Sequence, residues 1–227
     1  MAFNSQTFKT RTLTAVIFVV VMLTGLLWNK WSFLVLFTLI HFGCWYEFVG
    51  LMKKIHGSNY LLYSLLGLFY VTLPIGLLIA LRNLFGIDIR DNSSDPGKLI
   101  PLALIFSLWI NDTMAYIVGS LIGKTQMSKV SPKKTWEGTI GGIILCVIAM
   151  TFIGQLISLN RIDSMFIALI CSIVGTLGDL LESKLKRLAG VKDSGHIMPG
   201  HGGFLDRFDS LLIAAPFVWL YVYFFMQ

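Results

Sequence analysis

The sequence predicts an all-α protein, a polytopic integral membrane helical bundle with about seven transmembrane spans. Hydrophobic residues make up 56% of its 227 residues and charged residues 13%, against roughly 45–50% and 25% in soluble domains. A soluble domain of this length has too little interior for so many apolar side chains, because a small fold keeps a large surface-to-volume ratio. The mean hydropathy of +0.76 therefore indicates that lipid is part of the solvent.

Seven apolar runs follow one another along the chain, and a membrane span needs about 20 such residues. The runs cover Leu13–Trp28, Trp31–Met52, Tyr60–Leu81, Leu99–Ile122, Trp136–Leu159, Ser164–Leu181 and Phe208–Phe225. The first is interpreted as a span rather than a signal peptide, because no small-residue cleavage site separates it from the second. The tight join at Asn29 and Lys30 allows either a helical hairpin or one interrupted element.

Basic residues are distributed unevenly between the two sides of the predicted bundle. With the N-terminus inside, the inner side has thirteen of the 18 Lys and Arg residues: Lys9, Arg11, Lys53, Lys54, Lys124, Lys129, Lys133, Lys134, Lys184, Lys186, Arg187, Lys192 and Arg207. The outer side has Lys30, Arg82, Arg90, Lys98 and Arg161. This asymmetry predicts that loops 123–135 and 182–207 face the cytoplasm. The membrane itself is expected to be a bacterial-type cytoplasmic (inner) membrane.

The net charge of +6 suits anionic lipid head groups or phosphorylated ligands without separating the two. Most Trp and Tyr residues lie toward the ends of the runs, as in an interfacial belt, so no nucleic-acid partner is expected. Cys44, Cys146 and Cys171 have no Cys or His at metal-ligand spacing. They are interpreted as small buried hydrophobic residues.

Ionisable residues inside apolar runs are costly and therefore candidates for a functional site. Glu47 ends the second run near Lys53 and Lys54, and is interpreted as an interfacial charge. Asp112 lies deeper in the fourth run and is a stronger candidate, although a structural contact between helices is the alternative.

Helical periodicity places Asp112 on one face with Tyr116, Gly119 and Gly123. Gly119 and Gly123 form a small-residue spacing that favours close helix packing. This face is therefore predicted to be buried against protein.

Carboxylates and basic residues gather at the end of the sixth run and the start of the seventh. Asp206 and Asp209, three residues apart, would share a face at the start of the last helix, where the helix dipole favours anions; capping is the alternative role. Carboxylates bind Mg²⁺ together with substrate phosphates, and Lys and Arg neutralise the remaining phosphate oxygens. This inventory indicates phosphoryl or nucleotidyl transfer, without a P-loop, a dinucleotide fingerprint or a zinc motif.

Thirteen residues between 183 and 209 then carry a family resemblance. They are Ser183, Lys186, Arg187, Lys192, Asp193, Gly195, Pro199, His201, Gly202, Gly203, Asp206, Arg207 and Asp209. In type and spacing they resemble the signature of the phosphatidate cytidylyltransferases, or CDP-diacylglycerol synthases, with Met198 as a conservative departure where Leu, Ile or Phe is usual. Residues 111–124 and 131–138 are similar to the family's upstream segment, so the resemblance covers roughly the C-terminal half.

The resemblance implies transfer of CMP from CTP to phosphatidate, giving CDP-diacylglycerol and pyrophosphate, with one or two Mg²⁺ ions at the cytoplasmic face. It implies Asp179, Asp206, Lys192 and Arg207 as catalytic residues, and Asp179, Asp206 and Asp209 as metal ligands. The implied substrate-binding residues are Asp112, Lys124, Ser131, Lys133, Lys134, Ser183, Lys186, Arg187, His201, Gly202 and Gly203. The two glycines would let the backbone approach phosphate, against an ordinary turn as the alternative, and His201 would be a hydrogen-bonding support.

Residues 1–98 are then expected to form N-terminal helices of the lipid cleft, and residues 99–227 the catalytic region. Membrane lipids are expected partners, and a homodimer is left open. Two other functions also remain open. A CTP-dependent lipid kinase of the polyprenol or dolichol type would release CDP instead of pyrophosphate. An ion-coupled transporter would use Asp112 and Asp179 within the membrane, but such proteins usually have internal repeats and none is found here.

Overall fold

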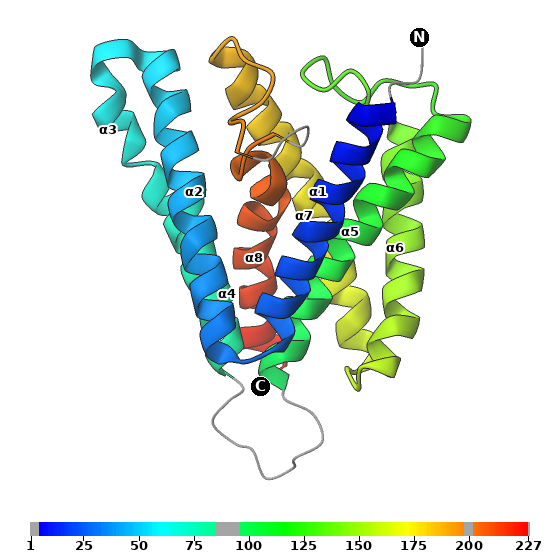
Figure 1. Ribbon diagram of the computed structural model, residues 1–227. Coiled ribbons are helices and arrows are strands. Elements are labelled where there is room, and N and C mark those ends of the chain that lie inside the picture. Colours follow the sequence, from blue (N-terminus) through cyan, green and yellow to red (C-terminus); the bar gives the residue numbers. More distant parts are fainter. Residues whose placement is uncertain (1–4, 85–95, 198–201, 227) are drawn as a thin grey trace. The chain divides into compact units, whose positions relative to one another are not determined.

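The computed structural model describes residues 5–84, 96–197 and 202–226 of the chain. Helices make up nearly all the regular structure of these residues, and an isolated β-bridge joins Gln126 and Thr135. The predicted all-α class is confirmed (Figure 1).

Six long helices and four short elements follow one another in the described part of the chain. The long helices are α1 (Ser5–Leu27), α2 (Lys30–His56), α5 (Pro96–Ile122), α6 (Trp136–Leu156), α7 (Arg161–Leu188) and α8 (Leu205–Phe225). The short elements are the 3-10 helix η1 (Gly57–Asn59), α3 (Tyr60–Ser64), the π-helix η2 (Leu68–Thr72) and α4 (Leu73–Leu84).

Five helical segments are long and apolar enough to cross a membrane, so the chain is a helical membrane protein. They are Lys30–Ser64, Gly97–Ile122, Trp136–Leu156, Arg161–Leu188 and Leu205–Phe225. Two further apolar segments, Thr12–Leu27 and Leu68–Asn83, are shorter than the about 20 residues that a span needs. The predicted count of seven spans is therefore not confirmed by the described residues.

The predicted third span, Tyr60–Leu81, is wrong as one continuous helix. The chain turns at residues 65–66 and then passes through η2 before α4 begins. Pro74 has no N–H for the carbonyl four residues earlier, and π-helical widening accommodates such an interruption. Gly67 lets the turn approach α2, since a Cβ there would lie 2.9 Å from the Trp45 ring.

The first two runs form separate helices rather than one interrupted element. The Asn29 side chain accepts hydrogen bonds of 2.8 Å from the backbone amides of Trp31 and Ser32. The Ser32 hydroxyl accepts one of 3.0 Å from the Asn29 amide. These reciprocal bonds are a capping box, which begins α2 at Lys30.

The ends of α7 and α8 differ from the prediction. The apolar run ends at residue 181, but α7 continues to Leu188, because its polar last turns remain helical until Gly190. Gly190 has a φ of +67°, and its amide and that of Val191 bond the carbonyls of Arg187 and Lys186. This Schellman motif ends the helix. With α8 beginning at Leu205, the predicted loop 182–207 is reduced to residues 189–204.

The contacts divide the chain into two compact units. The first comprises Met1–Thr72 and Leu185–Phe208, and the second Leu73–Lys184 and Asp209–Gln227. Contacts join α1, α2 and α3 within the first unit, and α4, α5 and α6 within the second. The predicted division at residue 98 into a lipid-cleft part and a catalytic part concerns function and stays a prediction.

Small residues bring α5 and α6 close together in the second unit. A Cβ at Gly138 would lie 2.7 Å from the Ala115 carbonyl oxygen and 2.8 Å from the Cα of Gly119. A Cβ at Gly142 would lie 2.8 Å from the Cβ of Ala115. The close packing predicted for this part of α5 is confirmed. The three cysteines are free and buried, also as predicted.

Candidate active site

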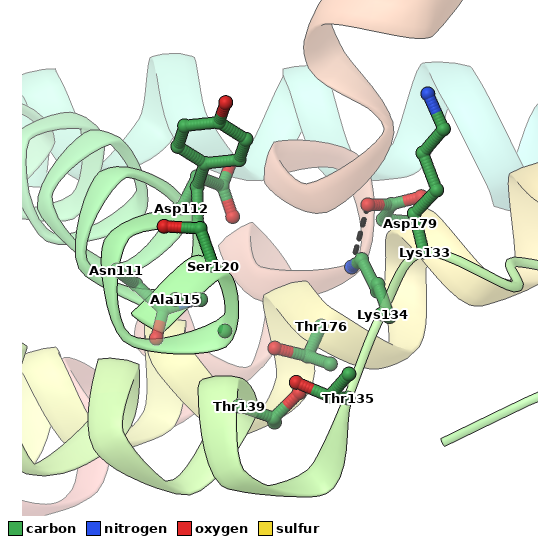
Figure 2. A pocket seen from close by; sticks show the side chains of 12 residues that line it. Asn111, Asp112, Ala115, Ser120, Lys133, Lys134, Thr135, Thr139, Thr176 and Asp179 are labelled. Carbon is green, nitrogen blue, oxygen red and sulfur yellow. Dashed lines mark ion pairs between the residues drawn. The ribbon is translucent and has the colours of Figure 1, made fainter. Parts of the chain in front are cut away.

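A pocket of about 400 Å³ lies in the second unit, between the C-terminal half of α5, the start of α6 and the C-terminal half of α7 (Figure 2). This volume is within the range of small-molecule sites, about 300–1,000 Å³. Four predicted site residues line it: Asp112, Lys133, Lys134 and Asp179. The other lining residues are Asn111, Ala115, Tyr116, Gly119, Ser120, Thr135, Thr139 and Thr176. The Ser and Thr residues of this lining were not predicted as site residues, because Ser and Thr hydroxyls in apolar helices commonly bond their own backbone.

An ion pair joins two of the predicted residues inside the pocket. The Lys134 ammonium lies 2.5 Å from a carboxylate oxygen of Asp179, with side chains 25% and 30% exposed. Ser183, one turn further along α7, donates a hydrogen bond of 3.2 Å to the other oxygen of Asp179. An anion-binding group and a cation-binding group thus share one wall of the pocket (Figure 2).

The loop that carries the lysines is held by its own backbone and by α6. The carboxylate of Glu137 accepts hydrogen bonds from the amides of Lys124, at 3.2 Å, and Thr125, at 3.1 Å. Thr135 caps α6 by accepting a bond of 3.2 Å from the Gly138 amide. Glu137 lies in the upstream segment 131–138, for which the sequence predicted no role at this position. In the structure its carboxylate holds the start of the loop.

Two other predicted residues of this loop do not line the pocket. The Lys124 side chain is exposed, and its backbone amide bonds Glu137. Ser131 accepts a bond of 3.1 Å from the Lys134 amide through its carbonyl oxygen. Their part in substrate binding stays a prediction.

Asp112 and Tyr116 lie at the edge of the α5–α6 contact. The prediction that their face is buried is wrong for both: Asp112 is exposed to the pocket and Tyr116 is 77% exposed. The reason is that α6 packs on the side of Ala115 and Gly119, where backbones approach closely. Asn111 beside them is 2% exposed, and its side-chain oxygen has no hydrogen-bond partner among the described residues.

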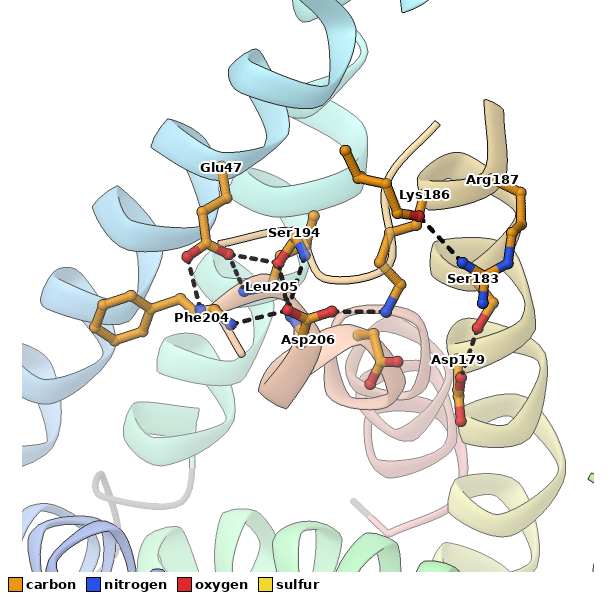
Figure 3. Close-up of polar contacts among 12 residues, drawn as sticks. Glu47, Asp179, Ser183, Lys186, Arg187, Ser194, Phe204, Leu205 and Asp206 are labelled. Carbon is orange, nitrogen blue, oxygen red and sulfur yellow. Dashed lines mark hydrogen bonds and ion pairs between the residues drawn. The ribbon is translucent and has the colours of Figure 1, made fainter. Parts of the chain in front are cut away.

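A second group of polar contacts surrounds Asp206 in the first unit (Figure 3). One carboxylate oxygen of Asp206 lies 2.6 Å from the Lys186 ammonium. The other accepts hydrogen bonds from the Ser194 amide at 2.9 Å and from the Gly203 amide at 2.8 Å, and it lies 2.9 Å from the Ser194 hydroxyl oxygen. Asp206 thus lies in the first turn of the last helix, as predicted, and contacts a basic residue.

Glu47 of α2 belongs to the same group, and the prediction that it is an interfacial charge is wrong. It is 3% exposed. Its carboxylate accepts hydrogen bonds from the amides of Phe204 (2.9 Å) and Leu205 (2.8 Å), and from the Ser194 hydroxyl (2.7 Å) (Figure 3). The cost of a carboxylate inside an apolar run was the available signal. In the sequence, the nearby lysines favoured an interfacial charge over this signal. In the structure, Glu47 pairs with backbone amides instead.

Backbone conformation and close packing explain why glycine occupies positions 202 and 203. Gly202 has a φ of +82°, in the left-handed region that favours glycine. A Cβ at Gly203 would overlap the Glu47 carboxylate, as would one at Gly195. The close approach is therefore made by carboxylates of the protein, and the predicted approach to phosphate stays a prediction.

The other predicted residues differ in their exposure to solvent. Lys192, Arg187 and Arg207 are exposed, and Arg187 donates a bond of 3.1 Å to the Val191 carbonyl. Asp209 is 8% exposed and accepts a bond of 2.6 Å from the Ser210 amide. His201 and Pro199 lie outside the described residues.

No group of three or more His, Cys, Asp and Glu side chains that could hold a metal ion occurs among the described residues. Mg²⁺ in phosphoryl-transfer sites often takes only one or two carboxylates and completes its shell with phosphates and water.

Comparison with known proteins identifies the family. A family described as "Cytidylyltransferase family" matches residues 77–225. The chain belongs to the cytidylyltransferase family. A phosphatidate cytidylyltransferase of Rickettsia bellii (strain RML369-C) is 36% identical over 219 residues, which cover 91% of this chain and 87% of the relative. One of Rickettsia typhi (strain ATCC VR-144 / Wilmington) is 31% identical over 225 residues, 95% of this chain and 92% of the relative. That of Bacillus subtilis (strain 168) is 47% identical over 116 residues, 49% of this chain and 43% of the relative.

The resemblance carried by residues 183–209 is thereby confirmed. The family match begins in α4 and ends with α8, so it contains both the pocket and Asp206. Glu47 lies outside the match. The loop between α7 and α8, residues 189–204, is called the motif loop below. Its most buried carboxylate contact comes from Glu47, in a part of the chain that the family match does not include.

Proposed function

We propose that the chain transfers CMP from CTP to phosphatidate, giving CDP-diacylglycerol and pyrophosphate. One observation carries the proposal: within the family match, a single pocket brings Lys133 and Lys134 together with the carboxylates of Asp112 and Asp179. Nucleotidyl transfer requires two kinds of group: basic side chains that bind phosphates, and carboxylates that bind divalent metal ions.

The reaction needs no covalent intermediate on the protein. A phosphate oxygen of phosphatidate is already anionic and attacks the α-phosphorus of CTP. The bond from that phosphorus to the oxygen bridging it to the β-phosphate breaks, and pyrophosphate leaves. The protein's part is to orient the two phosphates and neutralise their charges.

Basic side chains divide this work. Lys133 and Lys134 lie on the pocket wall, and we propose that they bind the triphosphate. Lys186, Arg187, Lys192 and Arg207 are proposed to bind the remaining phosphate oxygens, with Arg suited to gripping two oxygens at once. Because Lys134 and Asp179 are both partly exposed, their pair contributes only about 0–1 kcal/mol. Substrate phosphate can therefore replace the carboxylate beside Lys134 at little cost.

The proposed metal is Mg²⁺, with Asp179 as its ligand in the pocket. The donors there fit a hard cation, since the Asp179 side chain is 30% exposed and the Asn111 side-chain oxygen is buried without a hydrogen-bond partner among the described residues. Asp206 and Asp209 are further proposed ligands. When bound, the ion neutralises phosphate charge, including that of the leaving pyrophosphate.

The lipid substrate implies a site at the membrane surface. We propose the cytoplasmic face of a bacterial-type inner membrane, on the basis of the basic loops 123–135 and 189–204, and the homodimer stays a prediction. Labelling of single cysteines introduced at Lys129 and at Arg161 in intact cells tests the orientation. Protection of position 129 with labelling of position 161 is expected, and the reverse would contradict it.

Pyrophosphate release tests the reaction. Detergent-purified protein is given phosphatidate, Mg²⁺ and each of the four nucleoside triphosphates, beside Asp179→Asn and the control Asp163→Asn. Asp163 also lies on α7, but accepts a hydrogen bond of 2.8 Å from the Tyr221 hydroxyl away from the pocket. Pyrophosphate that requires CTP and phosphatidate and is lost only in Asp179→Asn is expected. Release of CDP from CTP with a polyprenol acceptor instead would overturn the proposal.

A further inference from the structure

Glu47 is a buried carboxylate whose two oxygens are both engaged. One accepts a hydrogen bond from the Phe204 amide, and the other accepts bonds from the Leu205 amide and the Ser194 hydroxyl. A carboxylate with 3% exposure in an apolar helix is costly unless such bonds compensate it. An apolar residue at position 47 would leave the Phe204 and Leu205 amides and the Ser194 hydroxyl without this acceptor.

The surroundings of Glu47 are shaped to its side chain. A Cβ on Gly195 or on Gly203 would overlap the carboxylate, so both backbone segments approach it as closely as a glycine allows. Gly43, one turn earlier on α2, similarly makes room for the Phe204 ring. Two backbone segments, at residues 194–195 of the motif loop and at residues 203–205 where it joins α8, are thus held by one turn of α2 (Figure 3).

Ser194 connects Glu47 to Asp206. Its hydroxyl lies 2.7 Å from a Glu47 oxygen and 2.9 Å from an Asp206 oxygen, and its amide donates to the same Asp206 oxygen. The other Asp206 oxygen remains for Lys186 at 2.6 Å. A continuous path of polar contacts therefore runs from Glu47 through Ser194 and Asp206 to Lys186.

The first amides of α8 need an acceptor, and two carboxylates are near them. Glu47 accepts hydrogen bonds from the amides of Phe204 and Leu205, and Asp206 accepts one from the amide of Gly203, just before the helix. Without Glu47, the amides of Phe204 and Leu205 lose this acceptor, and we expect Asp206, which already accepts the neighbouring Gly203 amide, to compete for them. Turning inward to do so would move it away from Lys186.

We propose that Glu47 is a positioning residue for the transfer reaction: it accepts the amides at the start of α8 and orients Ser194, so that Asp206 and Lys186 keep their contact of 2.6 Å. This inference rests on the proposed function. It assigns a role in the reaction to the N-terminal part of the chain, outside the family match.

The kinetic experiment uses the full-length protein in detergent with phosphatidate and CTP. Glu47→Ala is expected to lower kcat at least about 10-fold per folded molecule, with Glu47→Gln between it and the unaltered protein because it keeps one acceptor oxygen. Asp163→Asn is the matched control, since it removes a carboxylate hydrogen bond elsewhere, and it is expected to retain kcat. A kcat unchanged in folded Glu47→Ala and Glu47→Gln would overturn the inference.

A double substitution tests the route through Ser194. If Glu47 acts through Ser194, Glu47→Gln combined with Ser194→Ala lowers kcat no more than the larger of the two single effects. If the two effects multiply, the residues act independently and the route is wrong.

A third measurement does not depend on activity. Lys186 is 12% exposed and paired with Asp206, whereas Lys184 on the same helix is exposed. Acylation by an amine-reactive ester, quantified by mass spectrometry, is expected to rise several-fold at Lys186 in Glu47→Gln and to stay constant at Lys184. Unchanged labelling of Lys186 would overturn the inference even if the unaltered protein released no pyrophosphate. A lack of pyrophosphate with increased Lys186 labelling would overturn only the proposed function.

Discussion

The Lys134 ammonium and the Asp179 carboxylate lie 2.5 Å apart and tie the loop before α6 to α7. The pair places the proposed phosphate-binding residue next to the proposed metal ligand inside one pocket. Its partial exposure makes it weak, about 0–1 kcal/mol, so it orients both side chains without locking them. Four predictions follow from this pocket and its supports.

Lys134→Ala is expected to lower activity more than Lys133→Ala. Both lysines line the pocket, but Lys134 also contacts Asp179, so its loss removes a phosphate ligand and leaves that carboxylate without its cation. We expect kcat/KM to fall about 100-fold for Lys134→Ala, equivalent to about 2.7 kcal/mol, and about 10-fold for Lys133→Ala. Steady-state kinetics with varied CTP measure both, and equal effects would contradict a special role for the pair.

Asp179→Asn is expected to abolish detectable transfer while the protein remains folded. The substitution keeps the size of the side chain and removes the negative charge that a divalent cation requires. Because the pair with Lys134 is exposed and weak, the unfolding temperature should change by no more than a few degrees. Raising the Mg²⁺ concentration should not restore a normal rate; full recovery at high Mg²⁺ would show that Asp179 only tunes metal affinity.

Glu137→Ala is expected to weaken CTP binding more than it lowers kcat. The carboxylate holds the amides of Lys124 and Thr125, and with them the start of the loop that carries Lys133 and Lys134. A looser loop would have to be ordered by the substrate, which raises KM. Glu137→Gln retains one acceptor oxygen, so its KM for CTP should lie between that of the unaltered protein and that of Glu137→Ala. An unchanged KM in both variants would show that the loop keeps its shape without this tie.

Gly138→Ala is expected to destabilise the second unit by about 1–3 kcal/mol, as overpacking of a tight core does. The added Cβ would lie 2.7 Å from the Ala115 carbonyl oxygen, and backbone atoms cannot swing away. Gly76→Ala on α4 is the control, because nothing lies within 4 Å of a Cβ there. It should be neutral or stabilise by up to about 1 kcal/mol. Thermal unfolding in detergent compares the two, and equal unfolding temperatures would contradict the close packing of α5 and α6.

Much of the fold was predictable because apolar run length reports directly on lipid burial. The helices α5, α6 and α8 lie close to their predicted runs. The errors occur where backbone hydrogen bonding decides instead. Pro74 interrupts the third run, and the polar end of α7 remains helical until Gly190.

The candidate site was predictable where residue type alone carries chemistry. Asp179, Lys133 and Lys134 line the pocket, and Asp206 contacts Lys186. The hydroxyls of Ser120, Thr139 and Thr176 could not be predicted, since which face of a helix borders a pocket depends on how its neighbours pack.

The sequence by itself determined the membrane class and the family, because composition and short-range motif spacing are properties of the chain alone. Only the tertiary structure decided which charges meet. The 45 residues from Lys134 to Asp179 and the 147 from Glu47 to Ser194 separate partners that lie within hydrogen-bond distance. Such contacts depend on helix packing rather than on local preference, so Glu47 resembled a surface charge in the sequence and proved to be a buried acceptor for the start of α8.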